Sequence, residues 1–278
     1  MYLFIFAIII LLYFNNNIIE VSHYEVKSKK IPPSFNDFKI LQLSDLHSKN
    51  FGINNKHLIE KINDEKPDLI VMTGDMISHG DKNFKKFFNL CSKLVKQYDV
   101  YYILGNHEED LNKELKISLK NRLNSSHVNV LYNDKASITH NNETINLYGL
   151  CLSMKYYKKH LKIHGDFNIA ENTQLLGSLN KASYNILLAH NPLYFNVYSE
   201  WGADLILSGH IHGGIIRLPF IGGLLSPERK FFPKYYAGNY KLNNSELIVN
   251  RGLGNTKIKL RLFNNPEISI ITLKNDLC

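Results

Sequence analysis

The chain has 278 residues, 33 basic against 25 acidic, so its formal net charge is +8, and 44% of its residues are hydrophobic. This composition is typical of a folded protein with a sizeable core and excludes wholesale disorder. Its three cysteines, Cys91, Cys151 and Cys278, lie far apart and form no C-x-x-C pair. Neither a disulfide framework nor a thiolate metal site is therefore indicated. The lysines are scattered, which favours a solvated surface over nucleic-acid binding.

The N-terminal segment is the most apolar part of the chain. Residues 1–14 are apolar throughout, and an asparagine triplet and a second apolar pair follow. Fourteen helical residues span about 21 Å, short of the roughly 30 Å hydrocarbon core, but a helix that continued to Val21 would cross it. The segment lacks the basic start and the cleavage site of a secretory signal. We therefore expect residues 1–21 to be an uncleaved, single-pass membrane anchor.

Basic residues follow this segment, and none precedes it. Lys27, Lys29 and Lys30 come directly after it, which favours a cytoplasmic position for the rest of the chain over an exported one. Residues 22–36 contain a Pro-Pro pair and are expected to be a linker. Residues 37–278 are then expected to form one domain.

From residue 39 onward, apolar runs rich in β-forming residues each end in a polar cluster. Runs at 39–44, 69–73 and 100–104 end at Asp-Leu-His, Gly-Asp and Gly-Asn-His-Glu, respectively. Helix-like segments at 57–65 and 83–97 separate them, which predicts parallel strands whose carboxyl ends share one edge of a sheet. Polar side chains at those ends would therefore converge.

Two later runs end in the same way. The run at 184–189 stops at His190, and the run at 203–207 stops at Ser-Gly-His-Ile-His. Runs at 247–249 and 268–273 have no long helix between them, which predicts a mixed or second sheet.

The side chains at these ends are of the types that bind metals. They are Asp45, His47, Asp75, Asn106, His190, His210 and His212. A lone Asp-x-His or Gly-Asp is a weak signal, because Asp at a strand end is often a helix cap. Burying carboxylates and imidazoles together, however, is unfavourable unless cations hold them. Mixed nitrogen and oxygen ligands suit Zn, Fe or Mn and argue against Ca.

The order of these motifs resembles the calcineurin-like metallophosphoesterase superfamily, whose blocks are D-x-H, G-D, G-N-H-[DE], a lone H and G-H-x-H. The segments at 209–219, 233–238 and 250–254 narrow the resemblance to a membrane-associated bacterial branch, the YkuE/YaeI-like proteins. This resemblance implies an α/β fold: a four-layer α/β/β/α sandwich, here preceded by an N-terminal hydrophobic helix.

The resemblance also implies two divalent metal ions, Mn, Zn or Fe, and a role for each matching residue. One metal would be held by Asp45, His47 and His212, and the other by Asn106, His190 and His210, with Asp75 bridging the pair. The bridging carboxylate would leave room for a nucleophilic hydroxide between the metals. His107 would be the catalytic residue that contacts the phosphoryl group and donates a hydrogen bond or a proton toward the leaving oxygen.

Four further positions carry weaker expectations. Glu108 is predicted to orient the His107 imidazole. Arg217 and Arg251 are predicted to bind the substrate phosphate, although either could instead pair with a structural carboxylate. The sequence also departs from the family pattern at Ser78, beside His79, which stands where many relatives carry a further Asp, and this leaves the support of the metal ligands there in question.

The expected function is dimetal-dependent hydrolysis of a phosphoester. A phosphodiesterase or pyrophosphatase is favoured, acting on a membrane-associated, lipid-linked or nucleotide-linked substrate, with a UDP-2,3-diacylglucosamine pyrophosphatase as the sharpest candidate. The alternatives are a phosphomonoesterase, which includes a phosphoprotein phosphatase, and a non-catalytic, metal-stabilised scaffold at the membrane. Nucleic acid is not an expected partner, and no protein partner is predicted.

Overall fold

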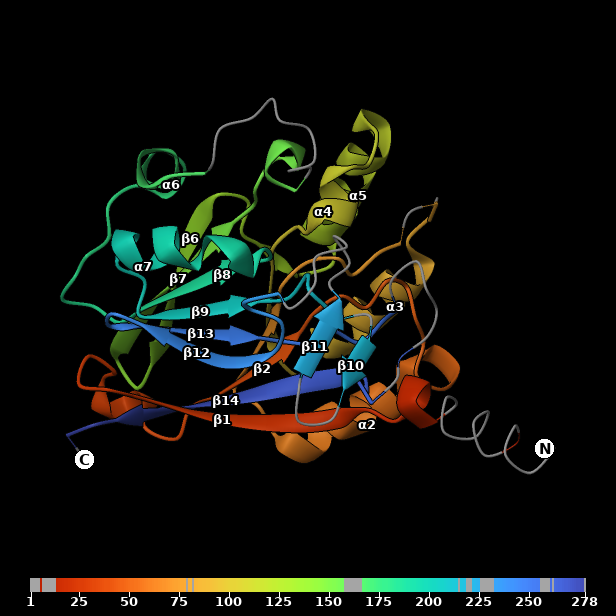
Figure 1. Cartoon of the computed structure of the whole chain (residues 1–278), viewed down its shortest axis with the longest axis horizontal. Coiled ribbons are helices and arrows are strands. Elements are labelled where there is room, and N and C mark those ends of the chain that lie inside the picture. Colours follow the sequence, from red (N-terminus) through yellow and green to blue (C-terminus); the bar gives the residue numbers. More distant parts are fainter. Residues whose placement is uncertain are drawn as a thin grey trace.

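Two six-stranded sheets form the centre of the protein (Figure 1). The computed structural model describes residues 6, 14–78, 80–81, 83–157, 167–214, 216–218, 222–225, 233–255, 261 and 263–277, with the backbone alone at 216–218 and 222–225. The first sheet has the strand order β1 (Glu20–Ser28), β14 (Glu267–Asn275), β2 (Lys39–Leu43), β3 (Leu69–Met72), β4 (Asp99–Tyr102) and β5 (Asn129–Val130). Strands β2, β3 and β4 are parallel, as predicted; β5, which was not predicted, is parallel to β4, and β14 runs antiparallel to β2.

The second sheet is also mixed. Its order is β12 (Gly238–Leu242), β13 (Ser245–Val249), β9 (Leu205–Ser208), β8 (Asn185–Ala189), β7 (Glu143–Leu150) and β6 (Asp134–His140). The four inner strands are parallel, and the two edge strands are antiparallel to their neighbours. A small hairpin, β10 (Ile216–Leu218) and β11 (Gly222–Leu225), stands apart from both sheets.

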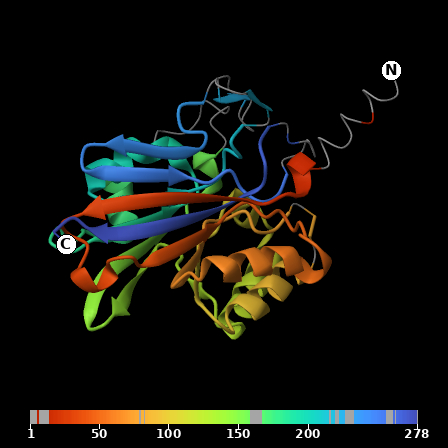
Figure 2. The same cartoon turned by 90° about the horizontal axis from the view of Figure 1, so that it is seen from below.

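Helices pack against both sheets (Figures 1 and 2). They are α2 (Lys56–Glu65), α3 (Lys85–Leu94), α4 (Asn106–Glu109), α5 (Lys113–Ser125), α6 (Ile169–Leu176) and α7 (Phe195–Trp201), with short 3-10 turns at Pro33–Phe35, Ile53–Asn55, Met154–Tyr156 and Pro192–Tyr194. Helix α3 buries Phe87, Leu90, Cys91 and Leu94, a spacing that places all four on one face.

Strand β8 shows how the layers are stacked. Ile186 and Leu188 belong to the core that also contains the first sheet, α2 and α3, whereas Leu187 packs with Phe195 and Trp201 of α7. Successive side chains of a strand point to opposite faces, so the second sheet lies between the first sheet and α7. The arrangement is consistent with the expected α/β sandwich.

The prediction that residues 1–21 form a membrane anchor is wrong. It required a helix that continues to Val21, but the helical backbone described at 14–17 ends there, and β1 pairs with β14 from Glu20 onward. Within the described part of the chain, no helix combines the length and apolar character needed to cross a bilayer. The rest of the expected hydrophobic helix, residues 1–5 and 7–13, lies outside the described residues.

The expected linker is also structured. Most of residues 22–36 belongs to β1 and to the turn Pro33–Phe35, so the folded unit begins before residue 37. The nine residues of β1 all pair in parallel with β14.

Candidate metal centre

The predicted ligand positions converge where strands of the two sheets end. Gln42 of β2 joins the sheets, because its side-chain amide donates to Thr73 Oγ1 and to the carbonyl of Ser208, both at 2.9 Å. Just beyond, the backbone N–H of His210 lies 3.1 Å from Asp45 Oδ2. These contacts hold the loops after β2 and β9 against each other.

The backbone at the predicted ligands is unusual. Five of the seven have a positive φ: Asp45 (50°), His47 (47°), Asp75 (52°), His210 (71°) and His212 (56°). Non-glycine residues rarely adopt this left-handed conformation, and each one costs on the order of 1–3 kcal/mol. Such strain persists where the surroundings impose it, typically at functional sites.

Two glycines allow the loops to approach this closely. A Cβ atom at Gly209 would overlap the side chains of Ser44 and Asp45, and one at Gly105 would overlap Asp75. Any larger residue at either position would push a predicted ligand out of place.

Two separate groups of side chains, each able to hold a metal ion, come together at this edge, and a third possible group, His47, Asp75 and His107, shares a residue with each of them. The first is Asp45, His47 and His212, and the second is Asp75, His190 and His210; in each, one potential ligand atom per residue lies within 4.8 Å of the others. In the first group, His212 Nε2 lies 3.2 Å from Asp45 Oδ1 and 3.1 Å from His47 Nε2.

Asp75 belongs to the second group and also faces the first. Its Oδ1 accepts a hydrogen bond from the backbone N–H of His107 at 2.8 Å. Its Oδ2 lies 3.4 Å from His190 Nε2 and 3.9 Å from both His47 Nε2 and His107 Nε2. One oxygen is thus fixed by the backbone, and the other faces imidazoles of both groups.

Burial and mutual charge shift the pKa values here. Burial alone would raise the pKa of Asp75, but the imidazoles of His190, His107 and His47 hold it well below its ordinary value. Burial lowers the pKa of His47 to about 3. Burial also lowers the pKa of His190, but the nearby negative charges of Asp75 and Asp45 outweigh this effect and raise it to about 9. The metal-free site therefore favours a protonated His190 beside two carboxylates.

The donors present fit divalent cations. His190 Nδ1 lies 2.6 Å from the Thr73 carbonyl, so Nδ1 carries the hydrogen and the Nε2 lone pair is available to a metal in the neutral ring. The Oδ1 atom of Asn106 is buried and has no hydrogen-bond partner among the described residues, although a buried amide oxygen normally has one. A cation would satisfy both atoms and neutralise the two carboxylates.

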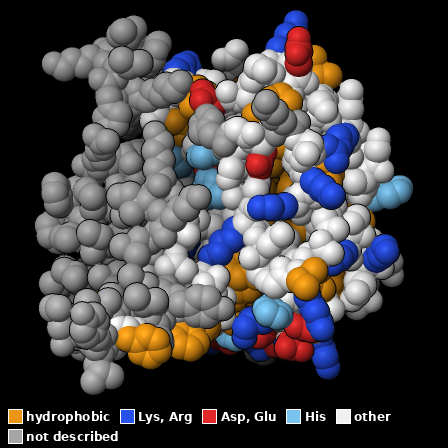
Figure 3. Space-filling view, turned by 90° about the vertical axis from the view of Figure 1, so that its right-hand side faces the viewer, with side chains coloured by type: hydrophobic (Ala, Val, Ile, Leu, Met, Phe, Trp, Pro, Cys, Tyr) orange, Lys and Arg blue, Asp and Glu red, His pale blue; other side chains and the backbone are white. Residues whose placement is uncertain are grey.

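His107 is more open than the carboxylates and the other imidazoles around it. Its side chain is 24% exposed, against 3% for Asp75 and 0% for His190. Its ring packs edge-on against His47, with centroids 4.5 Å apart. In the space-filling view, histidine side chains are visible from outside the protein, with basic side chains on the same face (Figure 3). A substrate that enters from solvent can therefore reach His107.

Glu108 lies elsewhere than predicted. Instead of turning to the His107 ring, its buried carboxylate accepts hydrogen bonds from the backbone N–H groups of Gly105 (2.8 Å), Asp75 (2.9 Å) and Ile77 (3.1 Å). Burial and the nearby Asp75 charge raise its pKa to about 7.

Arg251 is engaged in a structural ion pair. Its guanidinium lies 2.9 Å from Glu267 and 2.9 Å from Glu20, and its side chain is only 6% exposed. This is the alternative left open by the sequence, and it leaves the guanidinium committed to carboxylates. Arg217 belongs to β10, but its side chain lies outside the described residues, so its substrate contact stays a prediction.

Supporting residues appear that the sequence did not reveal. Ser78, where the sequence departs from the family pattern, donates through Oγ to the His47 carbonyl at 2.6 Å. Asp81 accepts from the Ser78 backbone and from Ser48 Oγ. Asn264 donates to the carbonyl of His212 at 2.7 Å. Asp81 lies only six residues after Asp75, so the sequence could have indicated it as a supporting residue. No motif near Asn264 indicates such a role. His79 lies outside the described residues.

Comparisons with known proteins agree with this site. The model of the calcineurin-like phosphoesterase family matches residues 38–214. The metallophosphoesterase YkuE of Bacillus subtilis (strain 168) is 33% identical over 271 residues, which cover 95% of this chain and 88% of YkuE. YkoQ of the same strain is 26% identical over 92% of this chain and 90% of its own. Phosphodiesterase YaeI of Escherichia coli (strain K12) is 28% identical over 85% and 82%, respectively.

The chain therefore belongs to the calcineurin-like metallophosphoesterase family, a family of metal-dependent phosphoric ester hydrolases. The predicted resemblance to the YkuE/YaeI branch is confirmed.

Proposed function

We propose that this enzyme is a phosphodiesterase that works with two divalent cations. One cation would be held by Asp45, His47 and His212 and the other by Asn106, His190 and His210, with Asp75 shared between them. The position of Asp75 Oδ2 carries this proposal, because it lies 3.4 Å from His190 of one group and 3.9 Å from His47 of the other. Mn, Zn and Fe are the ions that suit these donors.

Cations bound there would lower the pKa of a shared water and offset the charge on the phosphoryl oxygens. The protein itself holds the metal-binding side chains in fixed positions. The His107 N–H fixes Asp75 Oδ1, and the carbonyl of Thr73 fixes the His190 ring. Because these groups are already ordered before the substrate binds, little reorganisation is needed during the reaction.

His107 is the residue placed to meet the substrate. It follows Asn106 directly on α4, and its partly exposed imidazole faces the same space as Asp75 Oδ2. We assign it the donation of a hydrogen bond or a proton to the leaving oxygen, a role in which a positioned histidine typically contributes 10²- to 10⁴-fold.

A diester is favoured over a monoester because the relative YaeI, 28% identical over 85% of this chain, is named a phosphodiesterase. A second substrate to assay is UDP-2,3-diacylglucosamine, in which the enzyme would cleave the nucleotide-linked pyrophosphate bond. Its choice is based on the sequence resemblance alone.

The test compares two chromogenic substrates at one metal load. Full-length protein loaded with Mn or Zn is assayed with bis-p-nitrophenyl phosphate and with p-nitrophenyl phosphate. We expect kcat/KM to be at least about tenfold higher on the diester, with Asp75→Asn prepared in parallel to subtract contaminating phosphatases. The opposite preference would indicate a phosphomonoesterase. Tight metal uptake without turnover of any phosphoester would indicate a non-catalytic protein.

A further inference from the structure

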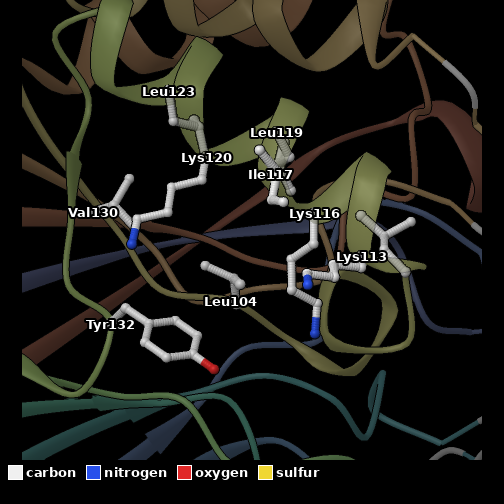
Figure 4. Close-up of a pocket in the computed structure, with 10 residues that line it drawn as sticks. Leu104, Lys113, Lys116, Ile117, Leu119, Lys120, Leu123, Val130 and Tyr132 are labelled. Carbon is white, nitrogen blue, oxygen red and sulfur yellow. The ribbon is translucent and has the colours of Figure 1, made fainter.

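A cavity of about 500 Å³ lies between α5 and the chain that follows β5 (Figure 4). Its floor and walls are formed largely by apolar side chains, among them Leu104, Leu119, Leu123 and Val130. The volume falls within the roughly 300–1,000 Å³ of small-molecule sites.

Two large hydrophobic side chains at this cavity remain open to solvent. Ile117 is 51% exposed and Tyr132 is 46% exposed, and Tyr132 lies across the cavity from α5 (Figure 4). Single exposed apolar residues are common, but a concave group of them indicates a surface that a ligand covers.

Three lysines border the same apolar surface. Lys113, Lys116 and Lys120 lie three and seven residues apart on α5, so they share one helix face. Their side chains extend from the helix over the cavity (Figure 4). Lys116 is neutralised by Glu109, 3.0 Å away. Lys113 and Lys120 form no ion pair with any described residue.

We propose that this cavity binds a single-chain amphiphile with an anionic head group. The alkyl chain would lie on Leu104, Leu119 and Val130, and the head group would be held by Lys113 and Lys120. An apolar floor alone would accept any hydrophobic ligand, but two unpaired cations above it select an anion. A purely polar anion, such as inorganic phosphate, would leave the apolar floor uncovered.

The cavity is connected to the metal centre through α4. Leu104 precedes Gly105 and Asn106 directly, and Lys116 also donates to the Glu109 carbonyl at 2.8 Å, at the end of the same short helix that carries His107. Binding in the cavity does not depend on the proposed diesterase activity, because it can be measured without turnover.

The test uses dodecanoate, at concentrations where it is monomeric, titrated into the full-length protein by calorimetry. We expect one dodecanoate per chain. Hexanoate is expected to bind at least about a hundredfold more weakly, because each buried methylene contributes roughly fourfold in affinity. Dodecyl maltoside, which has a neutral head group, is expected to bind at least about tenfold more weakly.

Three variants locate the ligand. The double variant Lys113→Glu/Lys120→Glu is expected to lose at least about tenfold in dodecanoate affinity. The control Lys85→Glu/Lys86→Glu, the same charge change at two exposed positions on α3, is expected to bind as the parent chain does. Asp75→Asn is expected to retain binding, which would place the ligand outside the metal centre. Equal binding of dodecyl maltoside, or unchanged affinity in the double lysine variant, would overturn the proposal.

Discussion

The carboxylate of Glu108 accepts a hydrogen bond from the backbone N–H of Asp75 at 2.9 Å. The same Oε2 atom accepts from Gly105 at 2.8 Å, and Oε1 accepts from Ile77 at 3.1 Å. One buried side chain thus connects the loop after β3, which carries Asp75, to the turn after β4, which carries Asn106.

This connection predicts the effect of Glu108→Gln. The amide can keep two of the three acceptor contacts but must place an NH₂ group against a backbone N–H. An unsatisfied buried donor costs about 1–3 kcal/mol, so the midpoint of thermal unfolding should fall. Metal affinity should fall with it, because the two loops carry ligands. The matched control is Glu114→Gln, which makes the same charge change at an exposed position on α5. Equal thermal midpoints and metal affinities for Glu108→Gln and the parent chain would contradict this role.

Asp75→Asn is expected to weaken both metals together. Asp75 faces imidazoles of both groups through Oδ2, so the loss of its charge affects both cations rather than one. We expect less than one metal per chain by elemental analysis and a loss of diester hydrolysis of at least about 10³-fold, equal to about 4 kcal/mol. A variant that kept its activity would remove Asp75 from its shared position.

His107→Ala is expected to separate catalysis from metal binding. The imidazole is more exposed than the buried groups around it, and its backbone N–H, which orders Asp75, survives the substitution. Metal content should stay at the parent level while kcat falls by about 10²-fold. Loss of metal in this variant would instead assign His107 to coordination.

Arg251→Met is expected to reduce stability rather than substrate binding. The guanidinium is buried against Glu267, 2.9 Å away, and breaking a buried pair by removing one partner costs about 3–5 kcal/mol. Urea unfolding should show a loss of this order, while KM for the diester stays within about twofold. Glu267→Gln should show a similar loss. A raised KM with unchanged stability would return Arg251 to the substrate site.

Metal removal is expected to destabilise the fold. A ligand that binds only the folded chain adds about 2.7 kcal/mol when its free concentration is one hundred times its dissociation constant. Treatment with EDTA should therefore lower the thermal midpoint, and added Mn should restore it. The shift should be smaller in Asp75→Asn. Identical midpoints with and without chelator would mean that the metal-binding groups contribute nothing to folding.

The strand ends could be predicted because buried strands have simple patterns. Runs such as the β3 residues Leu69–Met72 are wholly buried, and a polar cluster follows each one. Strand β1 could not be predicted, because most of its residues are not buried and its partner β14 lies more than two hundred residues away. An edge strand of this kind is stabilised by its ladder rather than by an apolar face.

The hydrogen-bond and ion-pair partners of individual side chains were harder to predict than which residues lie near the site. Glu108 follows His107 in sequence, yet its carboxylate accepts from the backbone of Asp75 and Gly105. Arg251 could have faced a phosphate, but Glu20 and Glu267 surround it. Both outcomes depend on how distant loops approach in space, which local spacing does not encode.

The most direct test of the central claim is the metal content of active, full-length protein, determined by elemental analysis alongside the rate of bis-p-nitrophenyl phosphate hydrolysis. The account predicts two transition-metal ions per chain, with activity that rises as both are loaded. Active protein that contains no transition metal would contradict it.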